Sequence, residues 1–162
     1  MTLGKSTDVT GALPFGGLYY QGVIDVYDGT RPVDADDAIS TQTFIGRITL
    51  NGGAFSEGTG TNGLVFATPT TTGSGASKVG VIAKPALTLW AMTAGTLSGT
   101  KTATWARLRG NAVDAGGLST VLPRIDMTVS IAGGTGELQL DVVTFVTGTE
   151  AQVSKFEYRQ GL

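Results

Sequence analysis

The sequence contains no cysteine and no histidine. Without cysteine the chain can form neither a disulfide framework nor a thiolate metal site. Without histidine it lacks the commonest general base and the commonest transition-metal ligand. Charged residues make up only 15% of the chain and the formal net charge is −2, so no strong field is available to attract nucleic acid or an acidic membrane. These shortages argue against an enzyme, a cofactor-binding protein and a nucleic-acid-binding protein.

Long apolar runs are missing as well. No run in the sequence approaches the roughly 18 residues that a membrane-spanning helix needs. Residues 1–20 also lack the basic start and the continuous apolar centre of a signal peptide. We therefore expect a soluble protein that is made in the cytoplasm and does not associate with a membrane.

Glycine, in contrast, is abundant, at 25 of 162 residues, which is about twice the usual share of roughly 7%. Together with many threonines and few lysines or glutamates, this composition favours short strands and turns over helices. No linker divides the chain and no repeat is visible. We predict a β domain over residues 22–162, preceded by an N-terminal arm over residues 1–21.

The stretch from Arg124 to Tyr158 shows the strand pattern most clearly. Alternate apolar residues predict five core positions, at Ile125, Met127, Val129, Leu138 and Leu140. Glycines in the segment 133–136 supply a reversing turn between two strands. In the last strand Val153 is out of phase with Phe156, which predicts a β-bulge near Ser154 and Lys155.

Other strand candidates follow at turn-separated spacing along the whole chain. They cover residues 22–27, 43–50, 64–66, 78–84, 87–92 and 102–109. In the last of these, Trp105 and Leu108 lie on opposite faces, so the pattern leaves open which face is inside. Seven to nine short strands with Gly- and Thr-rich loops are typical of a single-domain antiparallel β-sandwich, either jelly-roll or Ig-like.

The N-terminal arm has apolar residues without strand or helix periodicity. These are Leu13, Phe15, Leu18, Tyr19 and Tyr20, flanked by glycines. One interpretation is a frayed terminus that partly docks on its own domain. The other is an arm that contacts a neighbouring subunit, because its apolar area would offset the entropy of ordering only against a partner surface.

Two local motifs are weak matches to ligand-binding sites. The segment Gly58–Gly63 fits G-x-G-x-x-G, but a strand-like segment follows it instead of the helix that a nucleotide site requires. The acidic run at Asp34, Asp36 and Asp37 lacks the glycine and glutamate of a calcium loop. We interpret it as the solvated start of one helical turn, and a loose surface Ca²⁺ stays open. We expect no cofactor, no metal site and no catalytic residue.

Charges divide unevenly between the two halves of the chain. Arg107 and Arg109 contribute to a basic bias in the second half, whereas Asp25 and the 34–37 run make the first half acidic. These charges can be ordinary solvated faces. Alternatively they form complementary patches on subunits that meet one another, with Arg107 and Arg109 as partner contacts.

Several short motifs resemble a signature of small structural proteins from tailed bacteriophages. The run Ile24–Pro32, followed by Ala35–Ala38 and the strand 44–50, is similar to an Ile-x-Ile-Tyr-x-Gly-x-x-Pro stretch with Ala-Asp-x-Ala after it. Further similar segments are 104–109, 136–140 and 153–156. The resemblance covers most of residues 22–158 but not the arm or residues 76–93. It implies a virion component and carries no catalytic residues.

From this resemblance we expect a capsid decoration or cement protein that stabilises the head lattice. Its partners would be the major capsid protein and copies of itself, as a homo-oligomer on the virion. Two alternatives stay open at this point. One is a tail or neck component, and the other is a carbohydrate-binding module on a fibre, with Trp90, Trp105 or Tyr27 stacking on sugar rings.

Overall fold

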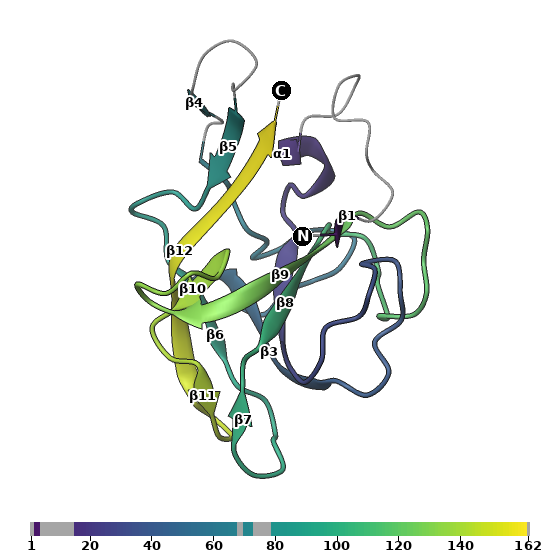
Figure 1. The fold of residues 1–162 in the computed structure, drawn as a ribbon, viewed down its shortest axis with the longest axis vertical. Coiled ribbons are helices and arrows are strands. Elements are labelled where there is room, and N and C mark those ends of the chain that lie inside the picture. Colours follow the sequence, from purple (N-terminus) through teal and green to yellow (C-terminus); the bar gives the residue numbers. More distant parts are fainter. Residues whose placement is uncertain (1, 4–14, 68–69, 73–78, 162) are drawn as a thin grey trace.

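The computed structural model describes residues 2–3, 15–67, 70–72 and 79–161 (Figure 1). Strands dominate this part of the chain, and its one helix, α1, spans only Phe15–Leu18. The strands are β1 Thr2–Leu3, β2 Val23–Asp28, β3 Thr43–Leu50, β4 Thr70–Thr72, β5 Val79–Ala83, β6 Trp90–Thr93, β7 Lys101–Thr102, β8 Trp105–Arg109, β9 Arg124–Ile131, β10 Leu138–Leu140, β11 Thr144–Phe145 and β12 Glu150–Gly161. The all-β prediction is confirmed. None of the described residues belongs to a helix long and apolar enough to cross a membrane.

Seven of these strands close into a barrel. Hydrogen-bonded neighbours follow the order β9, β8, β2, β3, β6 and β12, and β10 then pairs with both β12 and β9. The sequence predicted two stacked sheets. Here β10 joins β12 to β9, the two ends of a single sheet, so no separate second sheet exists. A closed barrel therefore describes the fold better than a sandwich.

The pairing of β10 with β9 is parallel, which corrects the predicted reversing turn between them. The register aligns Leu138 with Val129, and both strands run the same way. Parallel neighbours usually need a crossover of a dozen or more residues, whereas six residues connect these two. This short path requires glycine, because a Cβ on Gly136 would lie 2.8 Å from the backbone nitrogen of Ser130.

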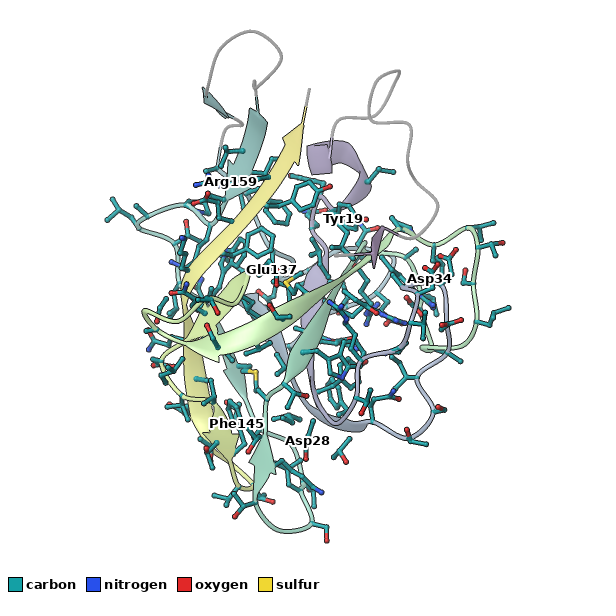
Figure 2. The ribbon with its side chains drawn as sticks, viewed as in Figure 1. Tyr19, Asp28, Asp34, Glu137, Phe145 and Arg159 are labelled. Carbon is teal, nitrogen blue, oxygen red and sulfur yellow. The ribbon has the colours of Figure 1, made fainter. Side chains whose placement is uncertain are left out.

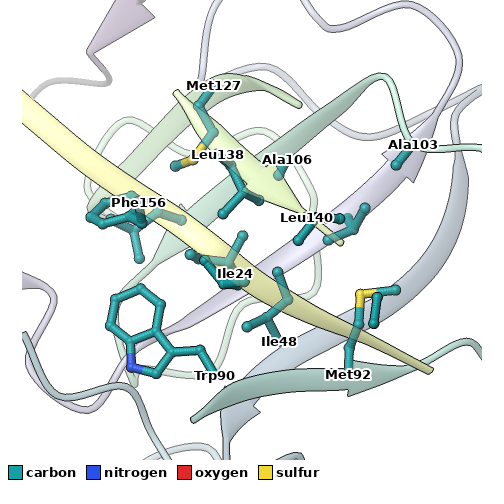
Figure 3. Close-up of a cluster of buried hydrophobic side chains, with 14 of the residues drawn as sticks. Ile24, Ile48, Trp90, Met92, Ala103, Ala106, Met127, Leu138, Leu140 and Phe156 are labelled. Carbon is teal, nitrogen blue, oxygen red and sulfur yellow. The ribbon is translucent and has the colours of Figure 1, made fainter. Parts of the chain in front are cut away.

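Alternation along the strands fills the barrel interior (Figure 3). On β2, Ile24 and Val26 lie in the core cluster with no exposed surface. The cluster also contains Ile48, Trp90, Met92, Ala106, Leu108, Ile125, Met127, Leu138, Leu140 and Phe156. Burial of this apolar surface supplies the main stabilisation of the fold.

The predicted core positions of the C-terminal strands are confirmed with one qualification. Ile125, Met127, Leu138 and Leu140 are each at most 1% exposed. Val129 is half-buried and packs against the cluster from its edge.

The predicted bulge in β12 is also confirmed. Gln139 of β10 aligns with Lys155, but the next residue, Leu140, aligns with Val153. Ser154 is therefore the extra residue, and it returns Val153 and Phe156 to the same buried face.

Strand β8 shows why its inward face could not be chosen from the sequence. Ala106 and Leu108 point into the barrel core, yet Trp105, Arg107 and Arg109 on the other face are also at most 2% exposed. Loops cover this outer face, so a strand that alternates in polarity is buried on both sides.

Two other local predictions are wrong. Residues 64–66 do not form a strand, although Leu64 is fully buried and its N–H donates to the Gly22 carbonyl over 2.8 Å. The acidic run forms a turn and no helix, with the Asp37 N–H donating to the Asp34 carbonyl over 3.1 Å. The Asp34 carboxylate accepts from the Asp36 N–H instead of capping a helix.

The described part of the N-terminal arm docks on the barrel of its own chain. Tyr19 is 3% exposed and belongs to the core cluster, and Leu18 packs against that cluster. Strand β1 adds to β9, with Thr2 opposite Asp126. Because Tyr19 is a core residue, the structural unit begins before residue 22.

Candidate functional site

The outer face of four neighbouring strands carries a row of alternating charges. The register places Arg47 of β3 beside Asp25 of β2, Asp25 beside Arg107 of β8, and Arg107 beside Asp126 of β9. Directly opposed residues in an antiparallel pair have their Cβ atoms about 4.5–5.5 Å apart. Strand pairing therefore places opposite charges at neighbouring positions on this face, and ion pairs form between Arg47 and Asp25 and between Arg107 and Asp126.

The pair of Arg107 and Asp126 is the most deeply buried. Nε of Arg107 donates to Oδ1 of Asp126 over 2.6 Å and Nη2 donates to Oδ2 over 2.8 Å. Neither side chain is more than 2% exposed. Burial raises the pKa of Asp126 above its ordinary value, although Arg107 acts in the opposite direction.

Asp25 joins two further arginines on the same face. Its carboxylate accepts from Nε of Arg47 over 2.6 Å and from Nε of Arg109 over 2.8 Å. Arg109 also donates to Oε1 of Glu57 over 2.8 Å. Burial alone would lower the pKa of Arg109, but Asp25 and Glu57 raise it above its ordinary value. Arg109 is therefore held in its charged form.

Arg124 binds Asp114 through two hydrogen bonds and completes what we call the arginine network. Burial raises the pKa of Asp114, but hydrogen bonds from Arg124 and from the Gly116 N–H outweigh it and leave that pKa below its ordinary value. The network consists of four arginines and four carboxylates: Arg47, Arg107, Arg109, Arg124, Asp25, Glu57, Asp114 and Asp126.

The arginine network also holds two loops over the barrel. We call residues 29–42, between β2 and β3, the first cover loop, and residues 110–123, between β8 and β9, the second cover loop. Arg107 donates to the Asp37 carbonyl over 3.0 Å, and Arg124 donates to the Gly117 carbonyl over 2.8 Å. The buried guanidinium groups thus satisfy loop carbonyls that secondary structure leaves unpaired.

The cover loops also bind each other. The Ile39 N–H donates to the Gly116 carbonyl over 2.8 Å, and the Ser119 N–H donates to the Asp36 carbonyl over 3.0 Å. Figure 1 shows both loops on the same side of the barrel, the first in dark blue and the second in green.

Aromatic rings continue the same face beside the charges. Tyr27 stacks on Trp105 with ring centroids 4.5 Å apart, and Phe44 meets Tyr27 edge-on at 5.6 Å. Burial raises the pKa of Tyr27 far above its ordinary value. A pocket of about 320 Å³ lies here, and the residues that line it include Tyr27, Phe44 and Arg47.

The cover loops expose several large apolar side chains. Val33 is 89% exposed, Val113 70%, Leu118 74% and Val121 84%. We call these four residues the loop surface. Figure 2 shows side chains projecting outward along the cover loops, near the label of Asp34. The cover loops thus lie between buried ion pairs on one side and exposed apolar side chains on the other.

The structure corrects the predicted roles of Arg107 and Arg109. Each is 2% exposed and ion-paired, so neither forms an exposed basic patch or an ordinary solvated face. Charges on the polar face of a strand usually face water, which is why the sequence interpretation failed. The sequence signal that could have revealed the network is the alternation of charge at Asp25, Arg107 and Asp126, which lie opposite one another on neighbouring strands.

The apolar arm residues have different surroundings. Tyr19 is buried in its own core and is not available to a partner, Leu18 is half-buried, and Tyr20 is 56% exposed. Leu13 lies outside the described residues, and for Phe15 only the backbone is described. Contact between the arm and a neighbour stays a prediction for Tyr20, Leu18, Phe15 and Leu13.

The predicted sugar-stacking residues do not face solvent. Trp90 is fully buried in the core, Trp105 is 1% exposed, and Tyr27 is 7% exposed. A sugar ring needs an accessible aromatic face, so the carbohydrate-binding alternative is wrong for these three residues.

The weak ligand motifs gain no ligand set from the structure. Among the described residues, no group of three or more acidic side chains is arranged to hold a metal ion. Thr61 of the Gly58–Gly63 segment forms an isolated bridge with Ser56, and Gly63 lies close to the Gln21 backbone. Comparison with protein-family models, with curated proteins and with solved structures finds no match.

Proposed function

We propose that this protein is a structural component of a bacteriophage particle, and that it decorates the capsid and cements the head lattice. The short motifs at residues 24–32 and 35–38, which resemble those of phage structural proteins, support the particle assignment. The loop surface carries the docking role. It exposes four large apolar side chains on loops that buried ion pairs hold in place.

The mechanism follows from repetition on a lattice. Each copy would add buried contact area where capsid subunits meet, and weak contacts gain strength when many copies bind at once. Rigid cover loops favour such binding, because a surface that is already ordered loses less entropy when a partner covers it.

Copy number in purified virions tests the proposal. Gel densitometry against the major capsid protein should show hundreds of copies per particle, as expected for a lattice-binding protein. A handful of copies would favour the tail or neck alternative, and complete absence from virions would contradict the proposed function.

A further inference from the structure

We propose that the pocket between the cover loops and the barrel binds an organic acid. The carboxylate of this ligand bonds to the arginines that line the pocket, and its apolar part packs against the aromatic rings beside them. The inference goes beyond the proposed function and does not depend on where the protein lies in a particle.

The pocket lies where the two cover loops meet the outer face of the barrel. Strands β2, β3 and β8 contribute to its lining, Ile39 comes from the first cover loop, and residues 114–116 come from the second. The Ile39 N–H donates to the Gly116 carbonyl, so the two loop walls are fixed to each other. The volume of about 320 Å³ is at the lower end of the range of roughly 300–1,000 Å³ for small-molecule sites. The pocket therefore suits a small molecule or a single side chain.

The arginines that line the pocket have N–H groups in excess of the acceptors around them. A guanidinium carries five N–H donors. With described residues, Arg107 makes three hydrogen bonds, Arg109 makes three and Arg47 makes two. Arg107 and Arg109 are each 2% exposed, and a buried donor without an acceptor costs free energy. The pocket is thus rich in donors that only water or a ligand can satisfy.

The carboxylates in the lining do not supply the missing acceptors. Both oxygens of Asp25 already accept hydrogen bonds from arginines. Both oxygens of Asp114 are occupied in the same way. A ligand carboxylate matches the site, because its two oxygens fit the planar fork of a guanidinium. The attraction is local hydrogen bonding and does not rest on net charge.

Aromatic side chains supply the apolar part of the site. Phe44 lines the pocket and keeps 45% of its surface exposed, and Tyr27 meets it edge-on at 5.6 Å. Tyr27 is held in turn by its stacking on Trp105. A ligand ring that covers Phe44 would bury apolar area. An organic acid therefore matches the lining better than an inorganic anion does.

An NMR titration of the full chain with sodium benzoate tests the inference, because benzoate joins a carboxylate to an apolar ring. We expect saturable shifts of the backbone amide signals of Ala115 and Gly116, which line the pocket, and of the Nε–H signal of Arg109. Thr93 and Gly95 line a second cavity of about 410 Å³, and their amide signals should not shift. Benzamide, which lacks the charge, and acetate, which lacks the ring, should each bind about tenfold more weakly or worse.

The first pair of variants tests the role of a pocket arginine. Arg47→Gln removes one guanidinium, while Asp25 keeps Arg109 as its partner. Arg159→Gln is the matched control, because Arg159 is exposed and lies on β12, outside the lining of the pocket. Arg47→Gln should weaken benzoate binding about tenfold, and the control should bind like the full chain. Circular dichroism melts verify that both variants are folded.

The second pair of variants tests which cavity is occupied. Ala115→Phe adds a ring at an exposed position in the lining of the pocket. Ala54→Phe adds the same ring at an exposed position in the lining of the second cavity. Only the first substitution should reduce benzoate binding.

A carboxylate can reach the pocket as a free acid or as part of a protein, and blocked dipeptides distinguish these sources. One dipeptide carries phenylalanine and glutamate, and its control carries phenylalanine and glutamine. If only the glutamate dipeptide displaces benzoate, the pocket accepts an acidic side chain of a partner protein. If neither displaces it, the pocket accepts a free acid. Both results support the carboxylate chemistry.

Other results would overturn the inference. Benzoate without any effect on Ala115 and Gly116 would contradict the site, and so would unchanged binding in both Arg47→Gln and Ala115→Phe. Equal binding of benzamide would contradict the carboxylate chemistry. Equal binding of inorganic phosphate would indicate an adventitious ion only. The ligand series uses the unmodified chain, so it decides the question even where a variant fails to fold, and none of these results bears on the proposed function.

Discussion

At the scale of single residues, the structure assigns the arginines a bracing role. Arg107 contacts a carboxylate on the neighbouring strand and a carbonyl of the first cover loop at once. Buried ion pairs contribute little net stability compared with an apolar replacement, but removing one partner leaves an uncompensated charge. The network therefore fixes where the loops lie more than it adds to the overall stability.

Replacing Arg107 with alanine tests this role. Asp126 would be left buried without its cation, so the free energy of unfolding should fall by roughly 3–5 kcal/mol. Lys155→Ala is the control, because Lys155 is exposed and lies 3.9 Å from Glu157, and surface pairs contribute about 1 kcal/mol or less. Urea denaturation measures both variants. Equal losses of unfolding free energy in the two variants would show that the buried pair of Arg107 and Asp126 contributes no more than a surface pair.

The pH dependence of stability follows from Asp114. Its pKa in the folded protein is below the ordinary value, so the pairing stabilises the protein above the unfolded pKa of about 3.9 and is lost as the pH falls through the folded pKa. The Asp114→Asn variant should therefore lose less stability than the wild type between neutral pH and pH 3. Urea melts across that range measure the difference, and parallel curves for the two proteins would contradict the assignment.

Tyr19 and Tyr20 are adjacent in sequence but have opposite surroundings, with 3% and 56% of their surface exposed. Tyr19→Ala leaves a cavity in the core and should cost about 3–5 kcal/mol. Tyr20→Ala should change stability by no more than about 0.5 kcal/mol. If both substitutions prove neutral in urea denaturation, the arm does not belong to the core.

At the scale of elements, the short connection between β9 and β10 closes the barrel. Its path depends on the close approach of Gly136 to the backbone of Val129 and Ser130. The Glu137 carboxylate then accepts from the Thr128 N–H over 2.8 Å. Burial raises the pKa of Glu137, but the hydrogen bonds from Thr128 outweigh it and lower that pKa.

Gly136→Ala tests this closure. The added Cβ would clash with backbone atoms at 2.8 and 2.9 Å, and overpacking of this kind costs about 1–3 kcal/mol. Gly117→Ala is the matched control, because it has ordinary φ and no atom within 4 Å of the added Cβ. Thermal melts should separate the two variants, and similar melting temperatures would mean that the connection can relax.

The sequence predicted the elements better than their assembly. Alternation identified the inner residues of β9 and β10, and a single break in phase located the bulge near Ser154 and Lys155. Local patterns could not predict the parallel pairing of β10, because it depends on a backbone contact between strands and not on side-chain period. They also could not show that Arg107 is buried, because the loop that covers it is distant in sequence.

At the scale of the whole molecule, the barrel, the arginine network and the loop surface form three successive layers. The core supports β2, β8 and β9, whose outer charges hold the cover loops, and the cover loops present apolar side chains to solvent. A protein built in this way can offer an ordered surface to a large assembly.

Electron cryomicroscopy of the purified phage particle tests the central claim most directly. The account predicts barrel-shaped density at the junctions between capsid subunits, with residues 29–42 and 110–123 facing the capsid. Density that fits the barrel only in the tail or neck, or a barrel on the head whose cover loops point away from the capsid, would contradict it.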